Sequence, residues 1–90
     1  TADDAREAVR LGRLAVELVP KNGDFRNTLG IARYRAGDLP GAIETLTASM
    51  TMRKGGDAAD WFPLALAHHR LGDQGEAHRL YGLAVEWMTR

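Results

Sequence analysis

An internal repeat constrains the fold of this chain more strongly than any other feature of its sequence. Residues 29–38 match residues 64–73 when the sequence is shifted by 35 positions, with small residues on small and apolar on apolar at most positions. A shift of 34 positions places Ala8 on Ala42 in the same way. Tandem units of this length are typical of stacked repeat architectures. The sequence therefore predicts two copies of one structural unit, preceded by half of another.

Each unit is predicted to be a pair of α-helices. Apolar residues recur at the three- and four-residue spacing of a helix, and no segment alternates as a β-strand does. Turn residues separate five such segments, namely Pro20 with Asn22-Gly23, then Gly37, Gly55-Gly56 and Gly72. Short turns between consecutive helices require antiparallel neighbours. We therefore expect an all-α fold of five helices.

Acidic residues mark where most of these helices are expected to begin. Asp4, Asp38 and Asp73 stand before the apolar periodic segments, where an N-cap accepts hydrogen bonds from free backbone N–H groups. Glu7 and Glu76 follow Asp4 and Asp73 by three residues, which is the spacing of a capping box. The second helix is expected to run from about residue 24 to residue 36.

The start of the fourth helix depends on Pro63. With Asp60 as the N-cap, Pro63 lies in the first turn, where its missing N–H has little effect. With Asp57 as the N-cap, Pro63 lies inside the helix, at a cost that reaches about 3 kcal/mol. We therefore expect this helix to begin at Asp60.

Composition and motifs exclude several functions for these 90 residues, which form one domain. Twelve basic residues balance 12 acidic ones, and this zero net charge argues against nucleic-acid binding. No apolar run reaches the roughly 20 residues that span a bilayer, and the lack of Cys excludes thiolate chemistry. His68 and His69 point about 100° apart on a helix, so they do not form a metal site together. We expect no enzyme activity, metal, cofactor or membrane partner.

The spacing of the repeat residues resembles the tetratricopeptide repeat family. The second unit follows the family pattern at Trp61, Leu64, Ala65, His68, Ala77, Tyr81 and Ala84, with Ala65 in place of Gly and His68 in place of Tyr. The resemblance implies a right-handed α-solenoid of antiparallel helix pairs, about two and a half units long. Residues 1–20 would be the second helix of a partial unit, residues 24–54 the first full unit and residues 58–90 the second. Segments around Asn27 and Trp61 also resemble repeats of large bacterial multidomain proteins.

The resemblance also implies a function, because the first helices of such units line a concave groove that receives a peptide or helix from a partner protein. Family-typical groove positions fall on Asn27, Ile31, Tyr34, Arg35, Phe62, Leu66, His69 and Arg70. Asn27 would hold a peptide backbone, and Arg35 and Arg70 a carboxylate. The alternative is that Tyr34, Phe62 and Leu66 pack against neighbouring helices. Of the whole set, we expect Ile31 and Leu66 to be structural.

Self-association is the alternative function. Trp87 and Met88 are expected on the outer side of the last helix, where exposed apolar side chains mark an interface. The chain would then be a structural or self-assembly segment, with copies associating through their terminal helices.

Two arginines depart from the repeat pattern. Arg26 and Arg33 occupy positions where the first full unit would carry large aromatic residues, and they share one helix face. Their stems are expected to pack at the rim with the charged groups in water. The alternative is an ion pair with Glu17 or Glu44.

Overall fold

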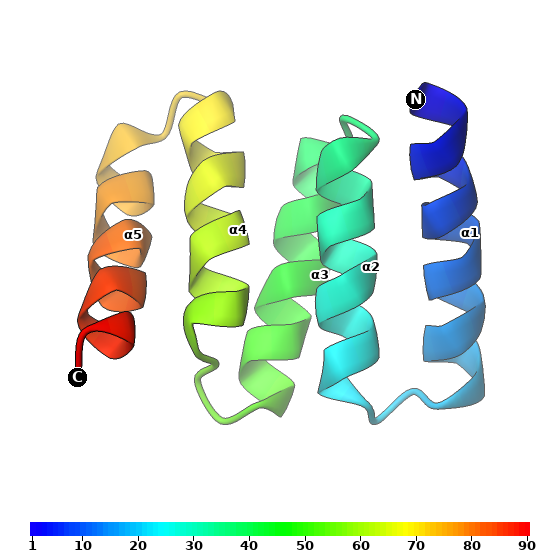
Figure 1. The fold of residues 1–90 in the computed structure, drawn as a ribbon, viewed down its shortest axis with the longest axis horizontal. Coiled ribbons are helices and arrows are strands. Elements are labelled where there is room, and N and C mark those ends of the chain that lie inside the picture. The colour runs from blue at the N-terminus through cyan, green and yellow to red at the C-terminus, as the bar shows by residue number, and fades with distance from the viewer.

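Five α-helices and no β-strands make up the structure, a computed structural model that describes residues 1–90 (Figure 1). The helices are α1 (Ala2–Leu18), α2 (Gly23–Arg35), α3 (Leu39–Met52), α4 (Ala58–Arg70) and α5 (Gln74–Met88). They follow one another along the 33 Å long axis, with α3 behind α2 in this view (Figure 1). Each helix packs against the next, and α2 also contacts α4. The all-α fold of five helices is confirmed.

The two turns inside the repeated units have nearly identical backbones. Gly37 and Gly72 adopt φ values of +86° and +88°, in the left-handed region that favours glycine after a helix. Asp38 and Asp73 follow with φ/ψ values of −85°/79° and −88°/78°, and both act as N-caps as expected. The sequence repeat is therefore matched by a repeat in the backbone at these turns.

The expected start of the first helix was wrong. Helix α1 begins three residues earlier, with Thr1 as its N-cap and Asp4 as the third helical residue of the capping box. The Glu7 side chain is not part of a cap and instead binds Arg10, with an Arg10 Nη2 to Glu7 Oε1 distance of 2.6 Å. Thr1 with Asp4 and Asp4 with Glu7 both have the three-residue spacing of a capping box, and only the box of Thr1 and Asp4 forms.

The expected capping box at the start of α5 forms only in part. The Asp73 side chain accepts a hydrogen bond from the backbone N–H of Glu76. The Glu76 carboxylate points elsewhere and binds the guanidinium group of Arg79, one turn further along the helix. A salt bridge between side chains thus replaces the second half of the box.

The expected start of the fourth helix was also wrong. Helix α4 is capped by Asp57, whose side chain accepts a hydrogen bond from the backbone N–H of Ala59, and Pro63 lies inside the helix. Pro63 has no N–H to offer the carbonyl oxygen of Ala59, four residues earlier. The side chain of Asn27 on α2 donates to that oxygen instead, at 2.7 Å. A tertiary contact therefore compensates for the proline, which no local pattern around residue 60 could reveal.

The core lies between the two helix pairs and combines small with large residues. Its buried members are Ala42, Leu46, Leu64, Ala65 and Leu80. Gly30 lets α2 approach α3 closely, because a Cβ atom there would lie 2.5 Å from Leu46 Cγ. None of the helices is both long enough and apolar enough to cross a membrane.

Candidate interaction surface

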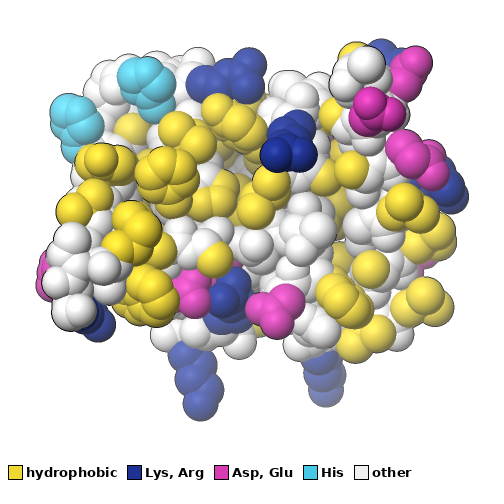
Figure 2. All heavy atoms as spheres, in the orientation of Figure 1, with side chains coloured by type: hydrophobic (Ala, Val, Ile, Leu, Met, Phe, Trp, Pro, Cys, Tyr) yellow, Lys and Arg dark blue, Asp and Glu magenta, His cyan; other side chains and the backbone are white.

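The eight residues expected in a groove lie on α2 and α4, the two helices that contact each other in addition to their chain neighbours. We call the surface that they form the α2/α4 surface. Figure 2 shows this face in the same orientation as Figure 1, with hydrophobic side chains and histidines at the α4 and α5 end and further hydrophobic side chains at the α1 end. The individual residues differ in how much of this surface they provide.

Ile31 and Tyr34 lie against the core. Both are half-buried and pack on the cluster that contains Leu46 and Leu64. Tyr34 also carries the guanidinium group of Arg70, whose Cζ atom lies 5.2 Å from the ring centroid. This cation–π contact joins the C-terminal halves of α2 and α4. Ile31 is therefore structural, as expected, whereas the Tyr34 ring supports an exposed positive charge.

Phe62 and Leu66 form an exposed apolar area on α4. Their exposed fractions are 40% and 38%, so the expectation that Leu66 is structural was wrong. Tyr81 on α5 extends the area, with 51% of the residue exposed and its ring centroid 6.2 Å from that of Phe62. A cavity of 140 Å³ opens beside them, lined by Ala65, Leu66, His69, Ala77, His78 and Tyr81.

Tyr81 was not among the residues expected on this surface. The sequence placed it among the residues that follow the repeat pattern, on the apolar face of the last helix. In the structure, the ring is half-exposed beside Phe62. Tyr81 follows Ala77 by four residues and both line the cavity next to α4, so this spacing was the signal that places Tyr81 beside α4.

Arg35 and Arg70 supply positive charge at separate places. Neither pairs with a carboxylate within 4.0 Å. Arg35 lies beside the start of α1, where it lines an open cavity with Asp4 and Ala8. His69 is engaged locally, because its Nδ1 atom lies 2.9 Å from Gln74 Oε1. Arg70 therefore remains an unpaired positive charge, one helical turn after Leu66 on α4.

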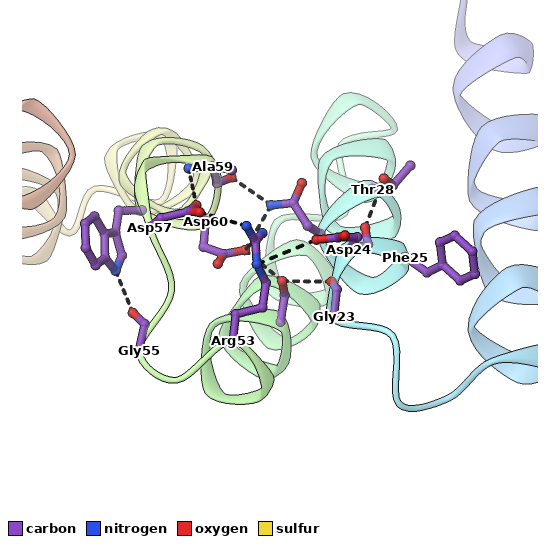
Figure 3. Close-up of polar contacts among 12 residues, drawn as sticks. Gly23, Asp24, Phe25, Thr28, Arg53, Gly55, Asp57, Ala59 and Asp60 are labelled. Atoms are coloured by element: carbon purple, nitrogen blue, oxygen red, sulfur yellow. Dashed lines mark hydrogen bonds and ion pairs between the residues drawn. The ribbon is translucent and has the colours of Figure 1, made fainter. Parts of the chain in front are cut away.

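Asn27 is used inside the molecule. Its side-chain amide donates to the Ala59 carbonyl oxygen at 2.7 Å and to Asp60 Oδ1 at 2.9 Å (Figure 3). An Asn side chain has two N–H hydrogens, so both are taken by these contacts. The expected role of Asn27 in holding a peptide backbone therefore conflicts with its geometry, and we leave it out of the surface proposed below.

A polar cluster surrounds Asp60 where α2, α3 and α4 meet, and Asn27 belongs to it through its contact with Asp60 (Figure 3). Asp60 is fully buried at its centre, with Ser49 Oγ 2.7 Å and Arg53 Nη1 3.5 Å from Oδ1. Arg53 also binds Asp57 through Nη2 at 2.8 Å and approaches Asp24 at 3.7 Å. The guanidinium group of Arg53 thus balances carboxylates from both helix starts, and no group of three or more His, Asp or Glu residues is arranged to hold a metal ion.

Trp87 and Met88 lie at the C-terminal end of α5. Their exposed fractions are 44% and 56%, and no aromatic partner pairs with the Trp87 ring. They are therefore available for contact with another molecule.

Comparison with known proteins adds no identity. The sequence matches no family model and no curated protein. The function of this chain therefore has to be inferred from its own residues.

Proposed function

We propose that this chain is a non-catalytic, tetratricopeptide-like module that binds a partner peptide or helix on the α2/α4 surface. The observation that carries the proposal is the exposed apolar area of Phe62, Leu66 and Tyr81. Arg70, which pairs with no carboxylate, follows Leu66 by four residues and so lies one turn further along the same face of α4. Aromatic residues and arginine are enriched in protein interfaces, and Tyr and Arg are among the residues that most often dominate binding energy. A segment with apolar anchors and an acidic residue would complement this surface.

The repeat supports the proposed architecture. Two helix pairs with matched turns at Gly37 and Gly72, preceded by a single helix, fit the proposed right-handed solenoid of about two and a half units. In stacked repeats, each unit contacts only its neighbours and leaves an extended face for a partner. In this architecture α2 and α4 would both line that face, although α3 separates them in the sequence.

A selection from a random peptide library tests the proposal. We expect the enriched peptides to combine large apolar residues with Asp or Glu. Leu66→Glu should weaken their binding roughly tenfold or more, because it places a negative charge in the apolar area. Leu14→Glu on α1 is the matched control, since Leu14 is an exposed leucine on another helix. Peptides that bind the Leu66→Glu variant as tightly as the unaltered chain would contradict the proposal.

Self-association is a second candidate, favoured by the exposure of Trp87 and Met88. Sedimentation velocity at several concentrations tests it. If copies associate through this end of α5, the average mass should rise with concentration, and Trp87→Ser should abolish the rise. Met52→Ser on α3 is the control, because Met52 is exposed elsewhere. A monomer at all concentrations would exclude this function.

A further inference from the structure

A cavity of 180 Å³ lies where α1, α2 and α3 meet, and three arginines line it. Arg13 comes from α1, and Arg26 and Arg33 come from α2. Glu17 and Thr45 complete its polar lining. Because Arg13 and Glu17 are exposed, the cavity opens to solvent along α1.

The internal repeat shows that arginines are unusual at these positions. A shift of 35 residues places Arg26 on Trp61 and Arg33 on His68. Trp61 packs against the core and donates its Nε1–H to the carbonyl oxygen of Gly55 at 3.0 Å. His68 lies 3.4 Å from Asp73. The second unit thus carries two engaged rings where the first unit carries two guanidinium groups around a cavity.

The positive charges of this cavity have no carboxylate partner. Neither Arg13, Arg26 nor Arg33 lies within 4.0 Å of an Asp or Glu, so the alternative of an ion pair between Arg26 or Arg33 and Glu17 or Glu44 is wrong.

Neutral oxygens take only part of the donor capacity of the two arginines on α2. Arg26 Nη2 donates to the carbonyl oxygen of Pro20 at 3.1 Å, and Arg33 donates to the Thr45 hydroxyl. The Nε–H of Arg26 is buried without any acceptor. Buried donors are almost always paired in folded proteins, so this one points to a missing acceptor.

We propose that this cavity binds a phosphate group, either as inorganic phosphate or as a phosphate monoester. Three guanidinium groups and the Glu17 carboxylate give a net charge of about +2, which balances the charge of about −2 on a phosphate monoester near neutral pH. Guanidinium groups bind phosphate oxygens through pairs of N–H donors. Arginines that reach the cavity from two helices suit a tetrahedral group with several oxygens better than a planar carboxylate. The site is separate from the α2/α4 surface.

Thermal unfolding of the full chain in inorganic phosphate, against chloride at equal ionic strength, tests the proposal. Phosphate at about ten times its Kd should raise the Tm by roughly 6 °C or more. Arg13→Gln, an exposed change that leaves the core intact, should weaken phosphate binding roughly tenfold. Arg79→Gln on α5 is the control and should leave binding unchanged. A Tm that does not respond beyond chloride, or that responds equally in Arg13→Gln, would overturn the proposal.

A double variant that carries the equivalent residues of the second unit tests the same site. Arg26→Trp with Arg33→His copies the second unit and should remove the response to phosphate. Retention of the full response in this variant would place phosphate elsewhere and refute the site.

Ligand class and source are tested with acetate and a short phosphoserine peptide. An equal response to acetate would refute the phosphate class. Tighter binding of the peptide than of inorganic phosphate would support the site and assign the phosphate to a modified protein. Tighter binding of inorganic phosphate would support the site and assign it to a small phosphate compound.

Discussion

The side-chain amide of Asn27 donates a hydrogen bond of 2.7 Å to the backbone carbonyl oxygen of Ala59, between α2 and α4. In an uninterrupted helix that oxygen would accept from residue 63, but Pro63 has no N–H. Asn27 therefore supplies the donor that the proline removes. The same amide binds Asp60 Oδ1, so one side chain connects α2 to both the backbone and the buried carboxylate of α4.

A double-mutant cycle between Asn27 and Pro63 measures this compensation. Asn27→Ala should reduce the free energy of unfolding by about 1–3 kcal/mol, because two acceptors lose their donor. Pro63→Ala restores a backbone N–H for the Ala59 carbonyl, so the loss should be smaller by about 1 kcal/mol in that background. Urea unfolding of the four proteins gives the coupling. An equal loss in both backgrounds would show that the proline does not depend on Asn27.

Arg53 should contribute more to stability than the other paired arginines. Arg53→Met leaves the fully buried Asp60 carboxylate without a cation, and removing one partner of a buried pair costs about 3–5 kcal/mol. Arg79→Met is the control, because its pair with Glu76 is exposed and exposed pairs contribute little. Urea unfolding compares the two. Similar losses for both variants would mean that the cluster around Asp60 adds no stability of its own.

Gly30 should tolerate no side chain. Gly30→Ala brings a Cβ within 2.5 Å of Leu46 Cγ and 3.3 Å of the Leu46 backbone nitrogen, and such overpacking costs about 1–3 kcal/mol. Gly82→Ala on α5 is the matched control, since nothing lies within 4 Å of its Cβ position. That change should stabilise the protein by up to about 1 kcal/mol through helix propensity. Thermal unfolding should therefore show shifts of opposite sign, and a shared sign would contradict this account of α2–α3 packing.

The fold could be predicted where its causes are local. Gly37 and Gly72 end helices because glycine adopts a positive φ easily, and Asp38 and Asp73 begin helices because their side chains reach free N–H groups nearby. Both signals lie within a few residues of the boundary that they determine. The start of α4 could not be predicted in this way, because the donor that makes Pro63 acceptable is 32 residues from Ala59.

The candidate surface was only partly predictable for the same reason. Spacing places Leu66 and Tyr34 on the same kind of helix face, but only tertiary packing decides which of them is covered. The buried cluster of Ser49, Arg53 and Asp60 was missed because its members come from two helices and the loop between them. Each has an ordinary local interpretation as a small seam residue, a loop cation or a helix cap.

The carboxyl groups of Glu7 and Glu76 should titrate below the ordinary range of glutamate. A hydrogen bond from Arg10 lowers the pKa of Glu7, and one from Arg79 lowers the pKa of Glu76. Because these pKa values are lower in the folded chain, the stabilisation is present above the pKa of the unfolded chain and is lost as pH falls through the folded pKa. The effect on stability should be small and sensitive to salt, since both pairs are exposed.

NMR titration of the side-chain carboxyl carbons checks these pKa values directly. Arg10→Ala should raise the pKa of Glu7 toward its ordinary value and leave that of Glu76 unchanged, because the two pairs lie on α1 and α5. Arg79→Ala should do the reverse, so each variant serves as the control for the other. Added salt should raise both pKa values in the unaltered chain, because ions screen exposed charges. A Glu7 pKa that is unchanged in Arg10→Ala would show that the guanidinium group does not hold the carboxylate in solution.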